Sequence, residues 1–452
     1  MRKGRVYASH SPKAFHVDAC IPRLYIAHGS MTHNESSPRV FRIRSLSIFL
    51  LGTILTGIFL GFSAPARDAS PGKADSRTKS GIDVLEEEGF ASLRGKRVGV
   101  VTNQTGVDSR GRRTIDQLAK ADGVKLVAIF SPEHGIAGNA DASVVANATD
   151  TATGLPIYSL YGETRRPTDA MLEGIDALVF DIQDVGVRFY TYVTTMGYCM
   201  EAAAKHKISF FVLDRPNPLG GEIIEGPMLD ADKRSFVGYF PMPVRYAMTL
   251  GELARMFNAE NKIGADLHVV EMKNWHRRDM YWMTGLQWIP PSPNLPTVAN
   301  LVPYPGIEIL QAGGVSVGRG TDSAFLEFGA PWIFQHDLVE RLKRRSIAGV
   351  HFSAQSFTPQ TGPYAGQECH GVKLEISDRD DFESILMGLE IAETLRRPYS
   401  QQFQIAKMIE LLGSQSTVKR LELDDNPKDI EAGWAAELKN FRAMRAKYLI
   451  YR

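Results

Sequence analysis

This chain of 452 residues has few cysteines and no marked excess of either charge. Its three cysteines, Cys20, Cys199 and Cys369, are too few for a disulfide framework and lack the spacing of metal ligands, so no structural zinc is expected. The formal net charge is +1, whereas binding to nucleic acid normally shows a basic excess or stripe. We therefore expect no nucleic-acid partner.

The sequence also lacks the motifs of several familiar enzyme classes. There is no G-x-x-x-x-G-K-[ST], no G-x-G-x-x-G after the first predicted strand, and no H-E-x-x-H. Without a phosphate-binding loop, a nucleotide cofactor is disfavoured. We expect neither a cofactor nor a catalytic metal.

One hydrolase motif is present. Residues 314–318 match the G-x-S-x-G motif of α/β-hydrolases, with Ser316 as the nucleophile. Possible bases downstream are His336, His351 and His370. The motif needs a helix that starts at once, whereas residues 319–323 are typical of a turn. A serine hydrolase remains the rival enzyme.

Residues 1–66 differ in composition from the rest of the chain. The stretch 45–66 carries no charge, follows three nearby arginines, and ends in Ala64-Pro65-Ala66, as expected of a secretory signal. An uncleaved anchor in the inner membrane is the alternative. Residues 67–80 are polar and resemble a flexible linker. We predict export to the periplasm or the extracellular space.

Apolar runs and helical segments alternate after the linker. The predicted strands are rich in Val, Ile and Phe, the pattern of strands buried on both faces. They span residues 97–103, 127–131, 177–181 and 208–214. Helices are predicted at 114–120, which opens with the capping box Thr114-x-x-Gln117, at 168–174 and at 192–205. The alternation predicts an α/β fold with a doubly wound parallel sheet.

Polar side chains follow each predicted strand. In a parallel sheet, the crevice outside the carboxyl ends of the strands binds the ligand. The candidates that this rule brings together are Asn103, Glu133, His134, Asp181, Gln183, Asp184, Asp214, Arg215 and Asn217. Glu133 is the leading acid or base, although it could merely cap a helix.

The composition changes near residue 236. Aromatic and proline residues become frequent, and the segment 288–296 is too rich in proline for a central strand. We expect a doubly wound domain at 81–235 and a smaller α+β domain at 236–452. The proline-rich segment, which contains Asn294, suits a sugar-binding wall or an interdomain crossover.

An exported protein that has several candidate carboxylates and needs no cofactor fits glycoside hydrolysis. One carboxylic acid protonates the leaving oxygen while a second group attacks or activates water. Glu133 would suit the acid role if burial raised its pKa, while Asp181 or Asp184 stayed ionised.

Long motifs identify a resemblance to a known family. The chain from about residue 81 to the C-terminus resembles the family long called domain of unknown function 1343, now associated with exo-acting β-N-acetylmuramidases. The motifs that carry the resemblance are residues 99–106 (GVVTNQTG), 131–135 (SPEHG), 158–162 (YSLYG), 181–192 (DIQDVGVRFYTY), 213–218 (LDRPNP), 225–227 (EGP), 290–296 (PPSPNLP) and 318–321 (GRGT).

The resemblance implies a Rossmann-like domain followed by a smaller domain, and removal of N-acetylmuramic acid from the non-reducing end of peptidoglycan fragments. It makes Glu133 the expected catalytic carboxylate with His134 beside it. One of Asp181, Gln183 and Asp184 would position water or the sugar. Tyr190 and Tyr192 would stack on the sugar ring or belong to the core, and Glu225 is the reserve carboxylate.

Muramic acid carries a lactyl carboxylate, so its recognition calls for a cation. Arginine binds carboxylates in a bidentate manner. Arg319 is the first candidate because it lies between two glycines, and Arg188 and Arg215 follow. Each could instead form a structural ion pair with Asp184 or Asp214. A wall-fragment binding module without turnover remains possible, because the same residues could bind without hydrolysing.

Overall fold

The computed structural model describes residues 77–140, 142 and 144–452. The predicted signal at 45–66 and nearly all of the predicted linker at 67–80 lie outside the described residues. Within the described ranges, no helix is long and apolar enough to span a bilayer.

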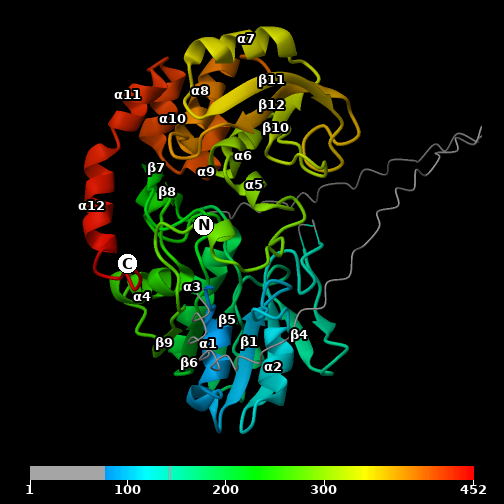
Figure 1. The fold of residues 1–452 in the computed structure, drawn as a ribbon, viewed down its shortest axis with the longest axis vertical. Coiled ribbons are helices and arrows are strands. Elements are labelled where there is room, and N and C mark those ends of the chain that lie inside the picture. The colour runs from blue at the N-terminus through cyan, green and yellow to red at the C-terminus, as the bar shows by residue number, and fades with distance from the viewer. Residues whose placement is uncertain (1–76, 141, 143) are drawn as a thin grey trace, which may run out of the picture. The chain divides into compact units, whose positions relative to one another are not determined.

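A seven-stranded sheet forms the first part of the fold, in the order β3-β4-β2-β1-β5-β6-β9 (Figure 1). All neighbouring strands are parallel except the edge strand β3. The strands are β1 (Arg97–Thr102), β2 (Lys125–Ser131), β3 (Ala148–Thr149), β4 (Pro156–Ser159), β5 (Ala177–Asp181), β6 (Ser209–Leu213) and β9 (Leu267–Val270). Counted along the chain, the six parallel strands have the order 3-2-1-4-5-6, which is the Rossmann order. The predicted doubly wound sheet is confirmed.

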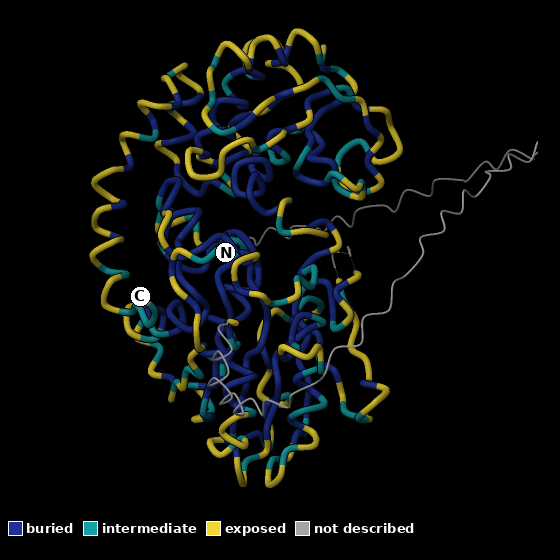
Figure 2. Tube along the Cα trace, viewed as in Figure 1, coloured by how far each residue is buried: buried dark blue, intermediate teal, exposed yellow. Residues whose placement is uncertain are grey.

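Helices cover both faces of this sheet because successive side chains of each strand point to opposite faces. On β1, Val98 and Val100 pack in one apolar cluster with side chains of α1 (Gly81–Glu87) and α2 (Thr114–Lys120). Val101 packs in the other cluster with α3 (Thr191–His206) and α4 (Leu250–Glu260). The central strands β1, β5 and β6 are mostly dark blue in Figure 2, which reflects burial on both faces.

The order of the strands creates a switch point beside β1. The chain moves from β1 toward β2 and β4 on one side, and toward β5, β6 and β9 on the other. Ligands of open α/β sheets bind where the order reverses, outside the carboxyl ends of the strands. The residues that follow β1, β2 and β5 therefore lie in the expected place for a site.

Most of the helices and strands predicted from the sequence agree with the structure, and two local predictions are wrong. The bounds predicted for α2 and β5 agree with the structure. The capping box predicted at Thr114 is wrong: Thr114 is the first helical residue, and its hydroxyl instead donates to Asp181. The helix predicted at 168–174 is only a short 3₁₀ turn, Ala170–Leu172.

The second part of the fold contains a three-stranded antiparallel sheet and most of the remaining helices. Its order is β10-β12-β11, and a separate two-stranded sheet pairs β7 with β8. The elements are β7 (Glu225–Met228), β8 (Pro243–Arg245), β10 (Glu327–Ala330), β11 (Val350–Phe357), β12 (Cys369–Ile376), α5 (Val298–Leu301), α6 (Tyr304–Gly313), α7 (Gln335–Arg345), α8 (Ser384–Arg396), α9 (Ile409–Leu412), α10 (Gln415–Glu422), α11 (Pro427–Ala432) and α12 (Ala435–Arg445). The boundary near 236 stays a prediction; the large sheet includes β9, which follows it.

The C-terminal tail packs on the first part of the fold. After α12, Tyr451 donates its hydroxyl hydrogen to Asp214 Oδ2 at 2.7 Å, and Ile450 N donates to Glu252 Oε1 at 2.9 Å. Residues 446–452, which follow α12, are thus anchored to the first part of the fold, and α12 reaches them from the C-terminal helices (Figure 1).

Candidate active site

Glu133 lies two residues beyond the end of β2 and is half-buried. The hydroxyl of Thr191 donates a hydrogen bond of 2.6 Å to Glu133 Oε2. Thr191 is the first residue of α3, so the carboxylate lies at the N-terminus of a 16-residue helix. A hydroxyl donor and a helix N-terminus both stabilise negative charge. Sequence reasoning did not single out Thr191, although a hydroxyl at a predicted helix start was the available signal.

His134 shapes the loop that carries Glu133. Its Nδ1 lies 2.7 Å from the carbonyl oxygen of Ala140, and Ala140 N donates back to the His134 carbonyl at 3.2 Å. A carbonyl can only accept, so Nδ1 carries the proton. His134 has a φ of 67°, a conformation that costs about 1–3 kcal/mol for a residue with a side chain and clusters at functional sites. These contacts favour a positioning role for His134.

Aromatic side chains lie behind Glu133. The rings of Tyr190 and Tyr192 have centroids 4.8 Å apart, and Tyr304 packs edge-on 6.3 Å from Tyr190. Tyr192 is fully buried; its hydroxyl accepts from Asn103 Nδ2 at 2.9 Å and donates to the Pro291 carbonyl at 2.7 Å. Tyr192 and Asn103 thus belong to the core that supports the site, and neither presents a face to a sugar.

Asp181 and Arg215 form a buried ion pair. Arg215 donates from Nε at 2.6 Å and from Nη2 at 2.9 Å to the two carboxylate oxygens, and Asp181 has no exposed surface. Arg215 also donates to the Val107 carbonyl at 2.8 Å. Arg215 thus forms a structural ion pair, but its partner is Asp181 and not Asp184 or Asp214, which the sequence suggested. Neither side chain is available to react.

Asp184 is buried and accepts from the hydroxyl of Tyr246 and, at 2.8 Å, from Gly186 N. Desolvation raises the pKa of this carboxyl to about 6, against the lowering effect of these donors. The neighbouring Gln183 donates from Nε2 to the carbonyls of Asp184 and Pro216, each at 2.8 Å. Both side chains face the protein interior. We therefore assign them to positioning the site and not to direct contact with substrate.

The remaining candidates, which follow β6 or open β7, also have partners within the protein. Asp214 accepts from Thr249 Oγ1 at 2.7 Å and from Gly251 N at 2.9 Å. Asn217 donates to the Met248 carbonyl at 2.9 Å, and Glu225 is paired with Arg245 at 2.7 Å. All three side chains are buried, so we assign their contacts to stabilising the fold and not to catalysis.

The arginines predicted to bind the lactyl group already have hydrogen-bond partners within the protein. Arg188 is fully buried and donates to four backbone carbonyls at 2.7–3.0 Å. Arg319 lies 2.5 Å from Glu308 Oε1, and its Nε donates to Gln311 at 2.8 Å. Asn294 supports the same loop by accepting from Gly320 N at 2.9 Å. The prediction that one of these arginines recognises muramic acid is therefore not supported by their contacts.

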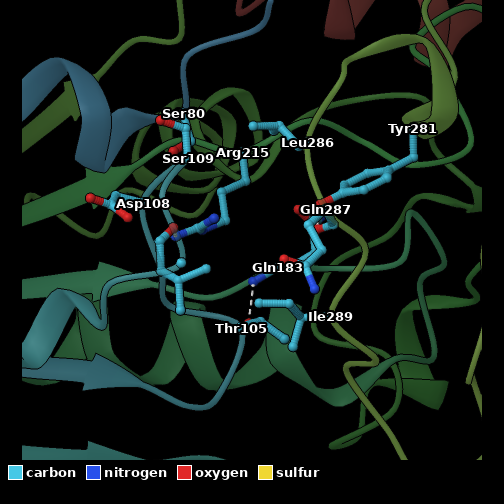
Figure 3. Close-up of a pocket in the computed structure, with 12 residues that line it drawn as sticks. Ser80, Thr105, Asp108, Ser109, Gln183, Arg215, Tyr281, Leu286, Gln287 and Ile289 are labelled. Carbon is cyan, nitrogen blue, oxygen red and sulfur yellow. Dashed lines mark hydrogen bonds between the residues drawn. The ribbon is translucent and has the colours of Figure 1, made fainter.

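A small pocket lies at the switch point between β1 and β5 (Figure 3). Thr105, Gln183, Arg215, Tyr281 and Gln287 are among the residues that line it. The space is about 30 Å³, which holds about one water rather than a sugar. The pocket is thus too small for a saccharide, and the half-buried Glu133 does not line it.

Other chemistries find no support among the described residues. No group of three or more His, Cys, Asp or Glu side chains there could hold a metal ion. Cys199 and Cys369 are buried and unpaired. No helix follows Ser316, whose hydroxyl accepts from Gly318 N at 3.3 Å, so the motif at 314–318 lacks the geometry of a hydrolase nucleophile.

Comparisons with known proteins agree with this fold. Residues 98–299 match the N-terminal domain described as exo-beta-N-acetylmuramidase NamZ, and residues 302–451 match its C-terminal domain. The chain is 41% identical over 412 residues to the peptidoglycan beta-N-acetylmuramidase NamZ of Bacillus subtilis (strain 168), covering 90% of this chain and 100% of that protein.

Solved structures agree as well. A crystal structure of a DUF1343 family protein from Bacteroides fragilis NCTC 9343 is 39% identical with a TM-score of 0.77, covering 84% of this chain and 100% of that one. A second DUF1343 structure from the same organism is 32% identical with a TM-score of 0.68, covering 83% and 99%. The chain therefore belongs to the NamZ family of exo-β-N-acetylmuramidases.

Proposed function

We propose that this chain hydrolyses the β-glycosidic bond of N-acetylmuramic acid at the non-reducing end of peptidoglycan fragments, and that Glu133 is the carboxylate that acts on this bond. The observation that carries the assignment is the contrast among the predicted acids. Asp181, Asp184 and Glu225 are enclosed by hydrogen bonds or ion pairs, whereas Glu133 keeps exposed surface at the carboxyl edge of the sheet.

Membership of the NamZ family supports the substrate class, and the site supports the chemistry. Hydrolysis of a glycoside needs a carboxyl group that exchanges a proton with the leaving oxygen or with water. The Thr191 hydroxyl, 2.6 Å away, holds the Glu133 carboxylate in one orientation. Asp181 and Asp184 are buried at the carboxyl end of β5. We assign both to positioning the residues around the site.

The test is hydrolysis of a chromogenic β-N-acetylmuraminide by the wild-type chain and by Glu133→Gln, with Glu163→Gln, an exposed acid of a neighbouring loop, as the matched control. We expect Glu133→Gln to lower kcat by roughly 10²- to 10⁴-fold, because general acid–base catalysis contributes that much. Glu163→Gln should retain full activity.

A binding module without turnover gives a different pattern. It would leave the wild-type chain inactive on the muraminide while muropeptides still bind, and Glu133→Gln would then bind as tightly as the wild type. Full activity of Glu133→Gln would remove Glu133 from the mechanism.

We propose further that residues 45–66 direct export. The uncharged stretch after a basic segment supports this, as does a substrate that lies outside the cytoplasm. Deletion of residues 45–66 should leave the protein in the cytoplasmic fraction. If the deleted chain still reached the cell envelope, the export signal would have to lie elsewhere.

A further inference from the structure

Muramic acid and the peptides attached to it carry carboxylates, yet the arginines first considered for them are occupied. Arg188 donates to four carbonyls, Arg215 is paired with Asp181, and Arg319 is paired with Glu308. A guanidinium that is already paired with one carboxylate binds a second carboxylate only weakly. A cation with its charge uncompensated must be found elsewhere near Glu133.

Arg165 meets this requirement. Its guanidinium carbon lies 4.4 Å from the ring centroid of Phe236 and 5.5 Å from that of Tyr161. The two rings have centroids 5.9 Å apart. Among the ion pairs of the described residues none involves Arg165, whereas the neighbouring Arg166 pairs with Glu201. Arg165 is exposed. Stacking uses the face of a guanidinium, so the N–H donors at its edge remain directed outward.

The strand register places Tyr161, one of the two rings under Arg165, beside the loop that carries Glu133. β2 and β4 are parallel neighbours with Ser131 opposite Ser159, and Leu160 N donates to the Ser131 carbonyl at 2.8 Å. Glu133 and Tyr161 therefore each follow their strand by two residues, on strands about 4.8 Å apart. Tyr161 also accepts at its carbonyl from Val145 N, at 2.6 Å, in the segment that follows His134.

Helix α3 connects the same two regions. Its first residue, Thr191, holds Glu133, and Tyr198, seven residues later, contacts Phe236 with a centroid distance of 6.0 Å. Seven residues are two turns, so both side chains lie on one helix face, about 10 Å apart along the axis. That separation is on the scale of a disaccharide or a short peptide, which places Arg165 within reach of a substrate bound at Glu133.

We propose that Arg165, held over Tyr161 and Phe236, binds a carboxylate of the substrate and selects for acidic peptidoglycan fragments. This assignment rests on the muramidase activity proposed above. The carboxylate belongs either to the lactyl group of the terminal sugar or to the stem peptide of a muropeptide. Both are planar anions that accept two parallel hydrogen bonds from one guanidinium.

The next residue provides a matched control. Arg166 lies 3.5 Å above the ring of Tyr198, but it is also paired with Glu201. Both arginines are exposed and both stack on an aromatic ring, and only Arg166 has its charge compensated. Loss of Arg166 should therefore have little effect on an acidic substrate.

The experiment compares kcat/KM for the wild type, Arg165→Ala and Arg166→Ala on three substrates. They are a chromogenic β-N-acetylmuraminide, the same compound with its lactyl carboxylate converted to an amide, and a muropeptide with a free peptide carboxylate. We expect Arg165→Ala to lose roughly 10- to 100-fold on an acidic substrate, mainly through KM, and little on the amide. Arg166→Ala should stay close to the wild type throughout.

The pattern of losses identifies the source of the carboxylate. A loss on the free muraminide assigns Arg165 to the lactyl group, and a loss on the muropeptide alone assigns it to the stem peptide. Equal losses on the acid and the amide, or no loss anywhere, overturn the inference.

A binding measurement separates this inference from the proposed function. Calorimetric titration of the Glu133→Gln chain with N-acetylmuramic acid, its amide and the muropeptide needs no turnover. If the wild type is inactive but acid-selective binding still depends on Arg165, the carboxylate site stands and the muramidase proposal fails. If turnover is normal and selectivity is unchanged in Arg165→Ala, the carboxylate site alone fails.

Discussion

Asp184 shows how one buried carboxyl can couple stability to pH. It lies in the protein interior, where desolvation raises its pKa to about 6, and only Tyr246 and backbone N–H groups offset that effect. Its Oδ1 is buried without a hydrogen-bond partner among the described residues. Because the folded-state pKa lies above that of an unfolded chain, the folded state favours the protonated form.

The pH dependence follows from the direction of this shift. The stability that Asp184 contributes is fully present below about pH 4 and is lost as pH rises through about 6. We expect Asp184→Asn, which cannot ionise, to remove that loss. Urea unfolding at pH 4, 5, 6 and 7 should show the wild type losing roughly 2–3 kcal/mol relative to the variant across this range. Parallel curves for the two proteins would contradict the raised pKa.

At the scale of elements, α3 links the catalytic acid to the sheet. The helix begins at Thr191, directly after the aromatic motif, and its side chains pack against the sheet over most of its length. The Thr191 hydroxyl therefore reaches Glu133 from a rigid element rather than from a loop. A donor on a rigid helix orients the carboxylate, which is what proton transfer requires.

Thr191→Val tests this connection. It keeps the shape of the side chain and removes the donor to Glu133 Oε2. We expect kcat on the muraminide to fall by roughly tenfold while KM changes little, because about 1.5 kcal/mol of charge-assisted hydrogen bonding is lost. Thr191→Ser, which keeps the hydroxyl, should restore the rate. A Ser variant as slow as the Val variant would mean that packing, and not the hydrogen bond, is what matters.

At the scale of the whole described chain, Arg188 joins segments that are far apart in the sequence. Its guanidinium donates to the carbonyls of Pro227 and Met242 and to those of Leu411 and Leu412. Full burial lowers the pKa of Arg188 to about 9 because few charges compensate it. The Met242 carbonyl also accepts from Leu229 N at 3.2 Å, and Arg188 is the side chain that links all four carbonyls.

Arg188→Met should therefore be strongly destabilising. The substitution keeps the apolar stem and removes the side-chain donor that all four carbonyls share, which we expect to lower the free energy of unfolding by at least about 3 kcal/mol. Arg397→Met is the control, because Arg397 is exposed and forms only a surface pair with Asp424. Its effect should stay within about 1 kcal/mol. Similar unfolding midpoints for the two variants in urea would show that Arg188 is dispensable.

The limits of sequence reasoning are clearest at particular residues. The Thr114 motif was interpreted as a cap because the local pattern fits one, but the hydroxyl bonds to Asp181 on a strand far along the chain. Arg319 was chosen for its flanking glycines, and nothing local shows that Glu308 would neutralise it. β4 and β9 were missed because each is four residues long. The contacts of Thr114 and Arg319 join residues from different elements of the fold, so no local sequence pattern predicts them.

The sequence by itself determined the doubly wound sheet, the edge at which its polar residues gather, and the prominence of Glu133. Hydrophobic periodicity and strand ends are local properties, and the rule that parallel strands share a carboxyl edge extends them to three dimensions. Only the tertiary structure decided which polar side chains remain available. Asp181 and Arg215 neutralise each other, Asp184 is desolvated, and Glu133 keeps its exposed surface, because burial and charge pairing depend on neighbours that the folded chain supplies.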